Sequence, residues 1–573
     1  GASVARLADV FLGPVRPVLL VLWAGVGLLL VVGCGHVANL LLLRASERVH
    51  EWSVRAALGV TRRRLLRQLM TESLLLSAAA GALGLVVAVL AVGVVRTANL
   101  PDLPRLATAS IDIRAVAVAL GVTTLAGLLF GLVPVRHLFG QRVMGLAAGG
   151  RRSTATAGVW RARSALVAAN VAMATLLLVG SGLLVRSLSS LLAVSPGVDP
   201  RGVVTMQLWA SGERFRAGET ADQIATAVSF YDDVLARLRT LPGVTAASSV
   251  TTLPLGGNVD GYGLHIDGQF EANPQAAPSA DRFVVAGNYF EALRIPLIRG
   301  RLLEPGDRQG AEAVAVINET MARRLFEEGE PLGRRLRLGP QDADPRVIVG
   351  VVADVRHHGL DEPVGFQVYV PQAQWAWAET AMTLVIRSSA DPVAIVGPAR
   401  AAVRDLDAAQ PITAVRVYAD LIDATTSTRR FAARLLTVFA ATALLLSAIG
   451  LYGALAVTVG QRQREIGIRV ALGAPARVVR RMVLGQGLAP VGLGLTLGLA
   501  VALLASSSLG SLLYDLSGHD PATFVTAAVL VAGCGLLACL PPAARAARLD
   551  PSPRCGRSRR SASSGRFHGP GGL

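Results

Sequence analysis

The sequence has 573 residues, of which 52% are hydrophobic and only 17% are charged, and its mean hydropathy is +0.50. This composition is too apolar for an ordinary soluble protein and indicates a membrane protein. A formal charge of +17 would suggest a nucleic-acid partner in a soluble chain. No aromatic-rich basic groove or nucleic-acid motif accompanies the charge, so no nucleic acid is expected as a partner.

Seven stretches of mainly apolar residues are long enough to cross a bilayer, which takes about 20 residues in a helix. They are residues 17–43, 72–95, 115–135, 165–186, 435–459, 486–508 and 522–542. Arginines concentrate in every second connection between them, and such connections lie in the cytoplasm by the positive-inside rule. We therefore predict a cytoplasmic C-terminus and a large external region, residues 187–434. The same arginines favour anionic lipids and a cytoplasmic partner as neighbours.

The external region has the pattern of a soluble α+β domain. Two β-α-β sets flank an insertion and predict a split ferredoxin-like layer. Their strands and helices are expected at Val203–Trp209, Ala221–Leu241, Val244–Val250, Met382–Arg387, Pro392–Leu406 and Ile412–Val417. The insertion, at about 256–379, alternates short apolar runs with turn residues and predicts a mainly β subdomain.

One segment of the sequence occurs twice, 414 positions apart, between long apolar stretches. Its matching residues are Glu51 and Glu465, Arg55 and Arg469, and Gly59 and Gly473. In each copy the acidic and basic residues are one helical turn apart, which supports an exposed helix by about 0.2–0.5 kcal/mol. The glycine can end that helix in a left-handed turn. The sequence therefore predicts a duplicated chain with a short cytoplasmic helix in each half.

No catalytic or metal-binding constellation is predicted, and the chain is not expected to be an enzyme. The sequence contains no lysine, and a phosphate-binding loop of the P-loop type requires one. Any ATP would therefore be bound by another polypeptide, and no cofactor is expected in this chain. Asp354, His357 and His358 are a poor metal site, because adjacent histidines on an extended segment point to opposite faces. A surface turn is expected there instead.

Several motifs resemble one family of permeases. The segment Glu465-Ile466-Gly467-Ile468-Arg469-Val470-Ala471-Leu472-Gly473-Ala474 resembles the signature of the superfamily that includes the macrolide exporter MacB and the cell-division protein FtsX. Pro196-Gly197-Val198-Asp199-Pro200 and Val316-Ile317-Asn318-Glu319 are similar to the periplasmic domain of that family. Two permease units in one chain resemble the duplicated ADOP-type branch, the acidobacterial duplicated orphan permeases.

The resemblance implies a permease subunit of an ABC-type system in the bacterial inner membrane. A separate cytoplasmic ABC ATPase would dock on the two short helices, and ATP hydrolysis there would move the periplasmic domain to export or extract a substrate. A periplasmic adaptor or substrate protein is a further expected partner. Two alternative classes remain open. The periplasmic domain could bind a regulatory or scaffold partner without transport, or the chain could be an orphan binding protein that has lost ATPase coupling. The short helices themselves could also serve only membrane topology.

The expected domain organisation follows the repeat. The family unit has four spans, and the first unit here has only three, so the resemblance implies that a portion precedes Gly1. The predicted parts are residues 1–140 (first permease unit, last three spans), 141–163 (cytoplasmic linker), 164–195 (first span of the second unit), 196–428 (periplasmic MacB-like core domain), 429–550 (last three spans of the second unit) and 551–573 (disordered tail). The tail departs from the usual family ending and is assigned no function.

Overall fold

The computed structural model divides the chain into two compact units, residues 1–188 with 429–573, and residues 189–428. We refer to them as the helical unit and the sheet domain. The structure describes residues 16–47, 62–97, 110–140, 152–215, 218–257, 259–267, 278–326, 329–340, 343–507, 510 and 513–548. All structural statements below refer to these residues.

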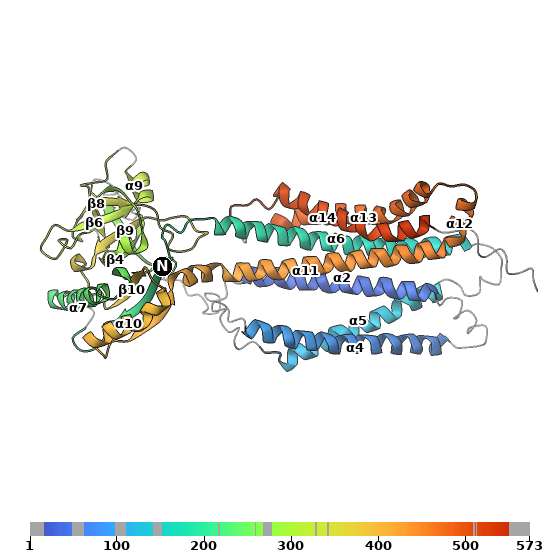
Figure 1. Cartoon of the computed structure of the whole chain (residues 1–573), viewed down its shortest axis with the longest axis horizontal. Helices are drawn as coiled ribbons and strands as arrows, with labels where there is room; N and C mark the ends of the chain where they lie inside the picture. The colour runs from blue at the N-terminus through green and yellow to red at the C-terminus, as the bar shows by residue number, and fades with distance from the viewer. Residues whose placement is uncertain are drawn as a thin grey trace, which may run out of the picture. The chain divides into compact units, whose positions relative to one another are not determined.

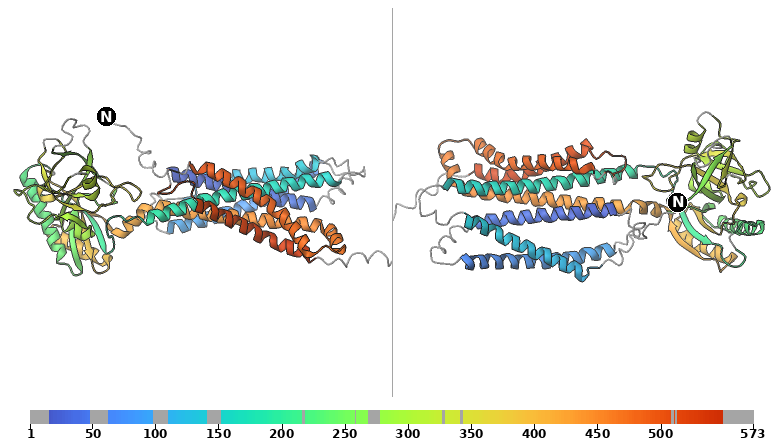
Figure 2. Two further views of the ribbon diagram at one scale, coloured as in Figure 1. Left: turned by 90° about the horizontal axis from the view of Figure 1, so that it is seen from above. Right: turned by 180° about the vertical axis from the view of Figure 1, so that it is seen from behind.

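The helical unit consists of long apolar helices and one short helix, α12 (Figure 1). They are α2 (Arg16–Glu47), α4 (Arg62–Thr97), α5 (Ile113–Gly140), α6 (Arg152–Leu192), α11 (Tyr418–Gln461), α12 (Gln463–Ala471), α13 (Ala476–Ser506) and α14 (Pro521–Ala547). Helices α4 and α5 pack against each other, as do α13 and α14. The same neighbours can be followed from two further directions in Figure 2.

Six of the described helices are long and apolar enough to cross a membrane. They lie at Arg16–Leu40, Met70–Gly93, Arg161–Leu192, Tyr418–Gln461, Ala476–Ser506 and Pro521–Ala547. The remaining predicted span, 115–135, falls in α5, whose apolar part Ile113–Leu128 is shorter. The chain is thus a multi-pass membrane protein, and the total of seven spans stays a prediction.

The expected linker 141–163 differs from the structure in its second half. Helix α6 begins at Arg152, so residues 152–163 continue the helix that the sequence placed from 164 onward. This stretch contains alanines and arginines, which favour a helix, and no proline to stop it. Residues 141–151 lie outside the described residues.

The first layer of the sheet domain has four antiparallel strands in the order β11-β1-β10-β2. The strands are β1 (Val203–Trp209), β2 (Val244–Val250), β10 (Ala381–Ser388) and β11 (Ile412–Val417). Helices α7 (Ala221–Arg239) and α10 (Pro392–Leu406) pack against each other beside these strands. Their apolar faces bury Tyr231, Val234 and Val403 in the same core as Met206 and Leu384 of the sheet.

Strand β11 forms an irregular edge of this layer. Its pairing with β1 shifts register between Thr205 and Gln207, and Ala414 adopts a positive φ of 48°. An extra residue in one strand of an antiparallel pair bends that strand and increases its twist. The edge strand is therefore kinked in its middle.

The insertion forms a closed cycle of six strands that is continuous with the first layer through β2 and β4. Around the cycle the pairings run β4-β3-β7-β8-β6-β9 and return to β4. The strands are β3 (Asp260–Ile266), β4 (Ser279–Gly287), β6 (Val314–Asn318), β7 (Arg335–Leu338), β8 (Arg346–Val352) and β9 (Gln367–Pro371). Strand β5 (Leu297–Gly300) pairs with the last residues of β8. Short helices α8 (Tyr289–Leu293) and α9 (Glu319–Leu325) complete the insertion. The prediction of a mainly β insertion is confirmed.

An aromatic cluster fills the second core of the sheet domain, where Tyr289, Tyr369 and Tyr418 are fully buried. The His357 ring stacks on Phe283 with 3.8 Å between ring centroids. Burial, with a smaller contribution from the neighbouring His358, lowers the pKa of His357 well below its usual value. His357 is thus a neutral core residue, and the surface position expected from the sequence is wrong for this residue.

Replacing His357 with Phe should reduce the sensitivity of the sheet domain to mild acid. Below a pH of about 6.5 an unfolded histidine takes up a proton, whereas buried His357 stays neutral. The unfolded state then binds more protons, so stability falls with decreasing pH by up to about 1.4 kcal/mol per pH unit. Thermal unfolding at pH 7.5 and 5.5 should separate the wild type from His357→Phe, with His265→Phe as the control. Equal acid sensitivity in all three proteins would contradict this assignment.

Candidate functional site

Helix α12 and the turn after it have the geometry that the repeated motif predicts. Glu465 Oε1 lies 2.7 Å from Arg469 Nη2, one helical turn later. Gly473 has a φ of +92°, a left-handed conformation that glycine adopts without the penalty of a side chain. Helix α13 then begins at Ala476, after Pro475. The predicted short helix, sharp stop and second helix are confirmed for the second copy.

The inner face of α12 packs onto the ends of three long helices. Ile466 is fully buried with Val459 of α11, Val479 of α13 and Ala543 of α14. Val470, one turn after Ile466, packs partly buried against the same cluster. Because one small core holds all four helices, a force on α12 would reach α11, α13 and α14 together.

The outer face of α12 combines charge with exposed apolar side chains. Ile468 is 55% exposed and Leu472 is 82% exposed, and Glu465 and Arg469 are half-exposed. Arg469 Nη1 also lies 2.9 Å from Met482 Sδ on α13, which fixes the direction of its guanidinium. We call Glu465, Ile468, Arg469 and Leu472 the α12 surface. Its two apolar residues are four apart on one helical face, a pattern suited to docking in a groove.

The corresponding residues of the first copy, Glu51, Arg55 and Gly59, lie outside the described residues. Their expected equivalence to the second copy therefore stays a prediction. The repeat in the sequence identifies the charged pair and the glycine of the second copy. It does not single out Leu472, whose exposure depends on how α12 packs.

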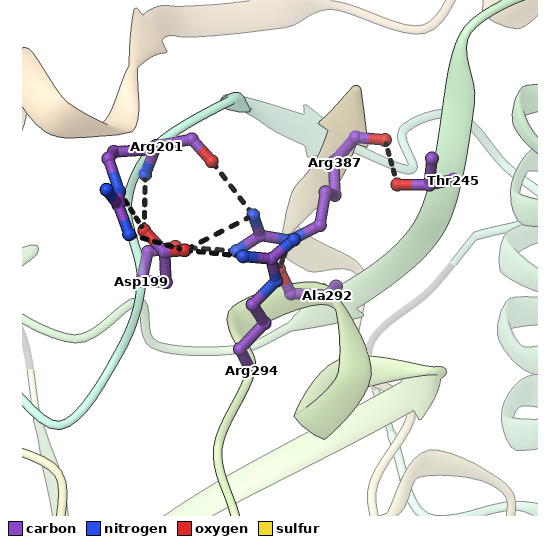
Figure 3. Close-up of polar contacts among 6 residues, drawn as sticks. All are labelled: Asp199, Arg201, Thr245, Ala292, Arg294 and Arg387. Atoms are coloured by element: carbon purple, nitrogen blue, oxygen red, sulfur yellow. Dashed lines mark hydrogen bonds and ion pairs between the residues drawn. The ribbon is translucent and has the colours of Figure 1, made fainter. Parts of the chain in front are cut away.

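A second arrangement of charged residues anchors the first residues of the sheet domain (Figure 3). Residues 196–201, here called the strap, follow α6 in the sequence. The backbone N–H of Asp199 donates to Leu293 O at 2.9 Å, and the N–H of Arg356 donates to Pro196 O at 3.0 Å. These bonds attach the strap to α8 and to the segment after β8.

Arg387 of β10 joins the strap to α8 by donating to two backbone carbonyls of the strap and one of α8. Its guanidinium donates to Ala292 O at 2.6 Å, to Arg201 O at 2.8 Å and to Asp199 O at 2.6 Å. The residue is only 7% exposed. Burial and then the nearby Arg294 lower the pKa of Arg387 from its usual value. The geometry marks Arg387 as a structural clamp, because its donors point at main-chain oxygens (Figure 3).

The carboxylate of Asp199 balances part of this positive charge. Arg201 Nε and Arg294 Nη1 donate to it at 3.0 and 2.9 Å. Burial by itself would raise the pKa of Asp199, but the hydrogen bonds from Arg201 and the charges of Arg201 and Arg387 outweigh burial and lower that pKa. Asp199 therefore remains ionised at neutral pH and pairs with Arg201 and Arg294.

The chain is anchored as well where it leaves β11, the last strand of the sheet domain. Tyr418, the first residue of α11, follows β11 without a connecting loop. Its side chain is fully buried, and its hydroxyl donates to Pro254 O at 3.0 Å. Both ends of the sheet domain are thus attached to its core by specific side-chain bonds.

No metal centre is found among the described residues, where no group of three or more His, Cys, Asp or Glu side chains could hold an ion. Asp354 accepts hydrogen bonds from Asn318 Nδ2 at 2.7 Å and from Thr320 Oγ1 at 2.6 Å. His358 lies 2.9 Å from Asp281. These contacts give Asp354 and His358 structural roles in the sheet domain.

Long apolar helices, an α+β domain and a short helix between two spans are the features of a multi-pass membrane protein with a folded domain outside the bilayer. Two family models match the chain. The MacB-like periplasmic core domain matches residues 164–406, and the FtsX-like permease C-terminal model matches residues 23–143 and again 437–551. The chain thus contains one segment similar to MacB-like periplasmic core domains and two segments similar to FtsX-like permeases.

Curated relatives carry the names of export proteins. The pyoverdine export ATP-binding/permease protein PvdT of Pseudomonas entomophila is 30% identical over 48% of this chain and 43% of its own length. PvdT of Pseudomonas aeruginosa is 26% identical over 70% of this chain and 60% of its own length. The macrolide export protein MacB of Bdellovibrio bacteriovorus is 29% identical over 44% of this chain and 40% of its own length. The chain therefore spans less than two thirds of each of these relatives.

Among solved structures, the periplasmic region of MacB from Actinobacillus actinomycetemcomitans aligns with 39% of this chain and 93% of its own length. Its TM-score is 0.26 and its sequence identity is 14%.

Proposed function

We propose that this chain is the permease subunit of an ABC-type system and that a separate cytoplasmic ATPase docks on α12. ATP binding and hydrolysis would move α12, and the movement would change the shape of the periplasmic domain to export or extract a substrate. The observation that carries the proposal is the α12 surface, an exposed apolar and charged face whose opposite side is locked to the ends of α11, α13 and α14. The export functions named for the relatives support it.

The proposal includes an orientation and an architecture. The α12 surface and the C-terminus would lie in the cytoplasm, α5 would complete seven spans, and residues 187–434 would lie in the periplasm. The two FtsX-like segments support a duplicated chain of the ADOP type. The order β11-β1-β10-β2 with two helices supports a split ferredoxin-like layer. Anionic lipids and a periplasmic adaptor or substrate protein would be its further partners.

In this scheme the strap and Tyr418 are the points at which movement enters the sheet domain. The strap follows α6, and Tyr418 starts α11. A flexible attachment at either point would let the helix move without moving the sheet domain. The hydrogen bonds of Arg387 and Tyr418 hold these points to the core, so that the domain would move with the helix. ATP would be bound only on the partner subunit, and the permease itself would be non-catalytic.

Reversing the charge of the docking helices should abolish ATPase binding. The full chain would be purified in detergent with its ATPase, and the bound ATPase would be quantified for Arg469→Glu and for Arg55→Glu/Arg469→Glu. We expect at least about a tenfold loss for the double variant, because two charge reversals place like charges against the partner. Co-purification also tests the orientation, since docking requires α12 to be cytoplasmic.

Arg404→Glu is the control matched to Arg469→Glu, because it reverses one charge at an exposed position of helix α10 in the sheet domain. It should retain the ATPase. If the double variant bound the ATPase as well as this control does, docking on these helices would be wrong. If the wild-type chain retained no ATPase, a regulatory or scaffold role would replace transport.

A further inference from the structure

Helices α2 and α11 lie side by side and run in the same direction (Figures 1 and 2). Val18 and Ala432, near the start of this contact, line the same small cavity. Further along, Asn39 Nδ2 donates to Gly450 O at 3.3 Å. The order of contacts is the same along both helices, so the pair is parallel.

The residues that meet between α2 and α11 occupy equivalent positions in the two copies of the repeat. The repeat offset of 414 positions pairs Val18 with Ala432, Gly25 with Phe439, Val32 with Leu446, and His36 with Gly450. In the structure the first pair lines one cavity, and the Val32 and Leu446 pair packs in one apolar cluster. In the other two pairs, the glycine lies directly beside the side chain of its partner. Buried residues at 18, 25, 32 and 39 recur every seven positions, the heptad spacing of one core position in helices that pack side by side. We call this contact the α2–α11 seam.

The seam joins a bulky side chain to a glycine at two levels, in opposite senses. A Cβ on Gly25 would lie 3.3 Å from Phe439 Cδ2 and 2.9 Å from Leu436 Cδ1, so the space beside Gly25 is filled from α11. A Cβ on Gly450 would lie 3.1 Å from His36 Nδ1, so the space beside Gly450 is filled from α2. Each helix therefore provides one bulky residue and one glycine hole to the other.

This complementarity exists only between unlike helices. Two copies of α2 in the same register would place Gly25 opposite Gly25, which leaves a void, and His36 opposite His36, which crowds the seam. Two copies of α11 would place Phe439 opposite Phe439, which crowds the seam, and Gly450 opposite Gly450, which leaves a void. Voids and overpacking both destabilise a packed interface.

Polar side chains on the same seam give a second reason why α2 should pack against α11 and not against another α2. His36 and Asn39 of α2 are 9% and 2% exposed, and the equivalent positions of α11 are glycines. Asn170 of α6, 4% exposed, lies beside Gly35, where a Cβ would come 2.4 Å from its Oδ1. Polar groups facing lipid are costly, so helices that carry them tend to bury them against a neighbour. Separation from α6 and α11 would expose three polar residues of this chain to lipid.

We infer that the α2–α11 seam favours packing of the first repeat copy against the second copy of the same chain over packing between identical helices of two chains. The first copy supplies the face that a second subunit would supply in a symmetric dimer, and a second copy of this chain is not needed to complete the seam. This inference concerns the pairing of the helices and does not depend on ATPase docking.

Cysteine cross-linking can test which helices pair. The four native cysteines would be replaced with serine, and Val32→Cys and Leu446→Cys would be introduced in the full chain. Oxidation should link α2 to α11 without changing the mass of the chain. Two separate chains, one with Val32→Cys and the other with Leu446→Cys, would also be co-expressed. They should give little product of doubled mass. A predominant doubled-mass product in either experiment would overturn the inference.

Exchanging the two residues at one level of the seam tests whether their sizes must be complementary. The measured quantity is the yield of the intrachain cross-link. Gly25→Phe alone and Phe439→Gly alone should each lower the yield by about tenfold, because one overpacks the seam and the other leaves a void. The double variant Gly25→Phe/Phe439→Gly should restore most of it. If the double variant were no better than the single variants, the assigned complementarity would be wrong.

Gly27→Phe provides the matched control. Gly27 is exposed on the same helix, and no atom lies within 4 Å of a Cβ placed there, so this variant adds the same bulk away from the seam. It should cross-link like the parent protein. A loss equal to that of Gly25→Phe would show that bulk anywhere on α2 disturbs the helix, and would overturn the role assigned to the seam.

Discussion

Replacing Arg387 with Met should destabilise the sheet domain by about 3 kcal/mol or more. Methionine retains much of the apolar volume but provides no donors, so the carbonyls of Asp199, Arg201 and Ala292 would lose the bonds that Arg387 makes to them. Each buried acceptor left without a partner costs about 1–3 kcal/mol. For a domain of this size, such a loss lowers the melting temperature by roughly 6–12 °C.

The measurement is thermal unfolding of the sheet domain in the purified full chain, with Arg237→Met as the control. Arg237 is exposed on α7, and a change there should stay within about 0.5 kcal/mol. Under the proposed function, Arg387→Met should also weaken the link between ATP hydrolysis and substrate export while the ATPase remains bound. Equal melting temperatures for the two variants would show that Arg387 does not clamp the strap.

Replacing Gly197 with Ala should destabilise the contact between the strap and the segment after β8. Gly197 has a φ of +82°, and a Cβ there would lie 2.2 Å from Asp354 O and 2.9 Å from Val355 Cα. Both obstacles are backbone atoms, so no side-chain rotation can relieve the clash. The backbone conformation alone costs a non-glycine residue about 1–2 kcal/mol. We expect a total loss well above that value.

Gly212→Ala separates the two contributions to this loss. Gly212 also has a positive φ, +110°, but nothing lies within 4 Å of a Cβ placed there. Its variant should therefore show the conformational cost without the clash. Denaturant unfolding of both variants would give the difference, which we expect to be at least about 2 kcal/mol. A Gly197→Ala protein as stable as Gly212→Ala would mean that the strap can move away from Asp354 at little cost.

Local signals in the sequence were sufficient for most elements of the first layer. Strands β1 and β2 and helix α10 begin and end where the apolar pattern and the flanking turn residues predict them. Asn318 caps α9 by accepting from Met321 N, three residues further along the chain. In α12 the Glu-Arg pair and the glycine turn define the whole element. Each of these features depends on residues that are close in sequence.

Features that depend on distant residues could not be predicted in the same way. Strand β5 has only four residues, all exposed, and its backbone pairing with β8 is what defines it. Strand β3 contains Gly261 and Gly263, which weaken the apolar alternation. The six-strand cycle closes only when β4 pairs with β9, far away in sequence.

The same limit applies to the candidate sites. Arg387 resembles the other arginines of the sequence until its main-chain partners are known. The apolar pattern of α2 gives a helix face but does not identify the helix that covers it. Glu465 and Arg469 were found because the motif is local and repeated. The binding experiment tests the ATPase partner proposed for them.

The kinked edge strand β11 also bears on how the sheet domain behaves at high concentration. A straight exposed edge offers unpaired backbone groups to a neighbouring molecule and invites sheet-to-sheet aggregation. The irregularity at Ala414 interrupts that row of groups, and Arg416 adds a charge next to it. In the insertion, closure of the strand cycle leaves few edges open. Where many copies of this chain lie close together, the kinked edge should therefore hinder pairing between the sheets of neighbouring molecules. The kink requires one residue, Ala414, in a strained backbone conformation.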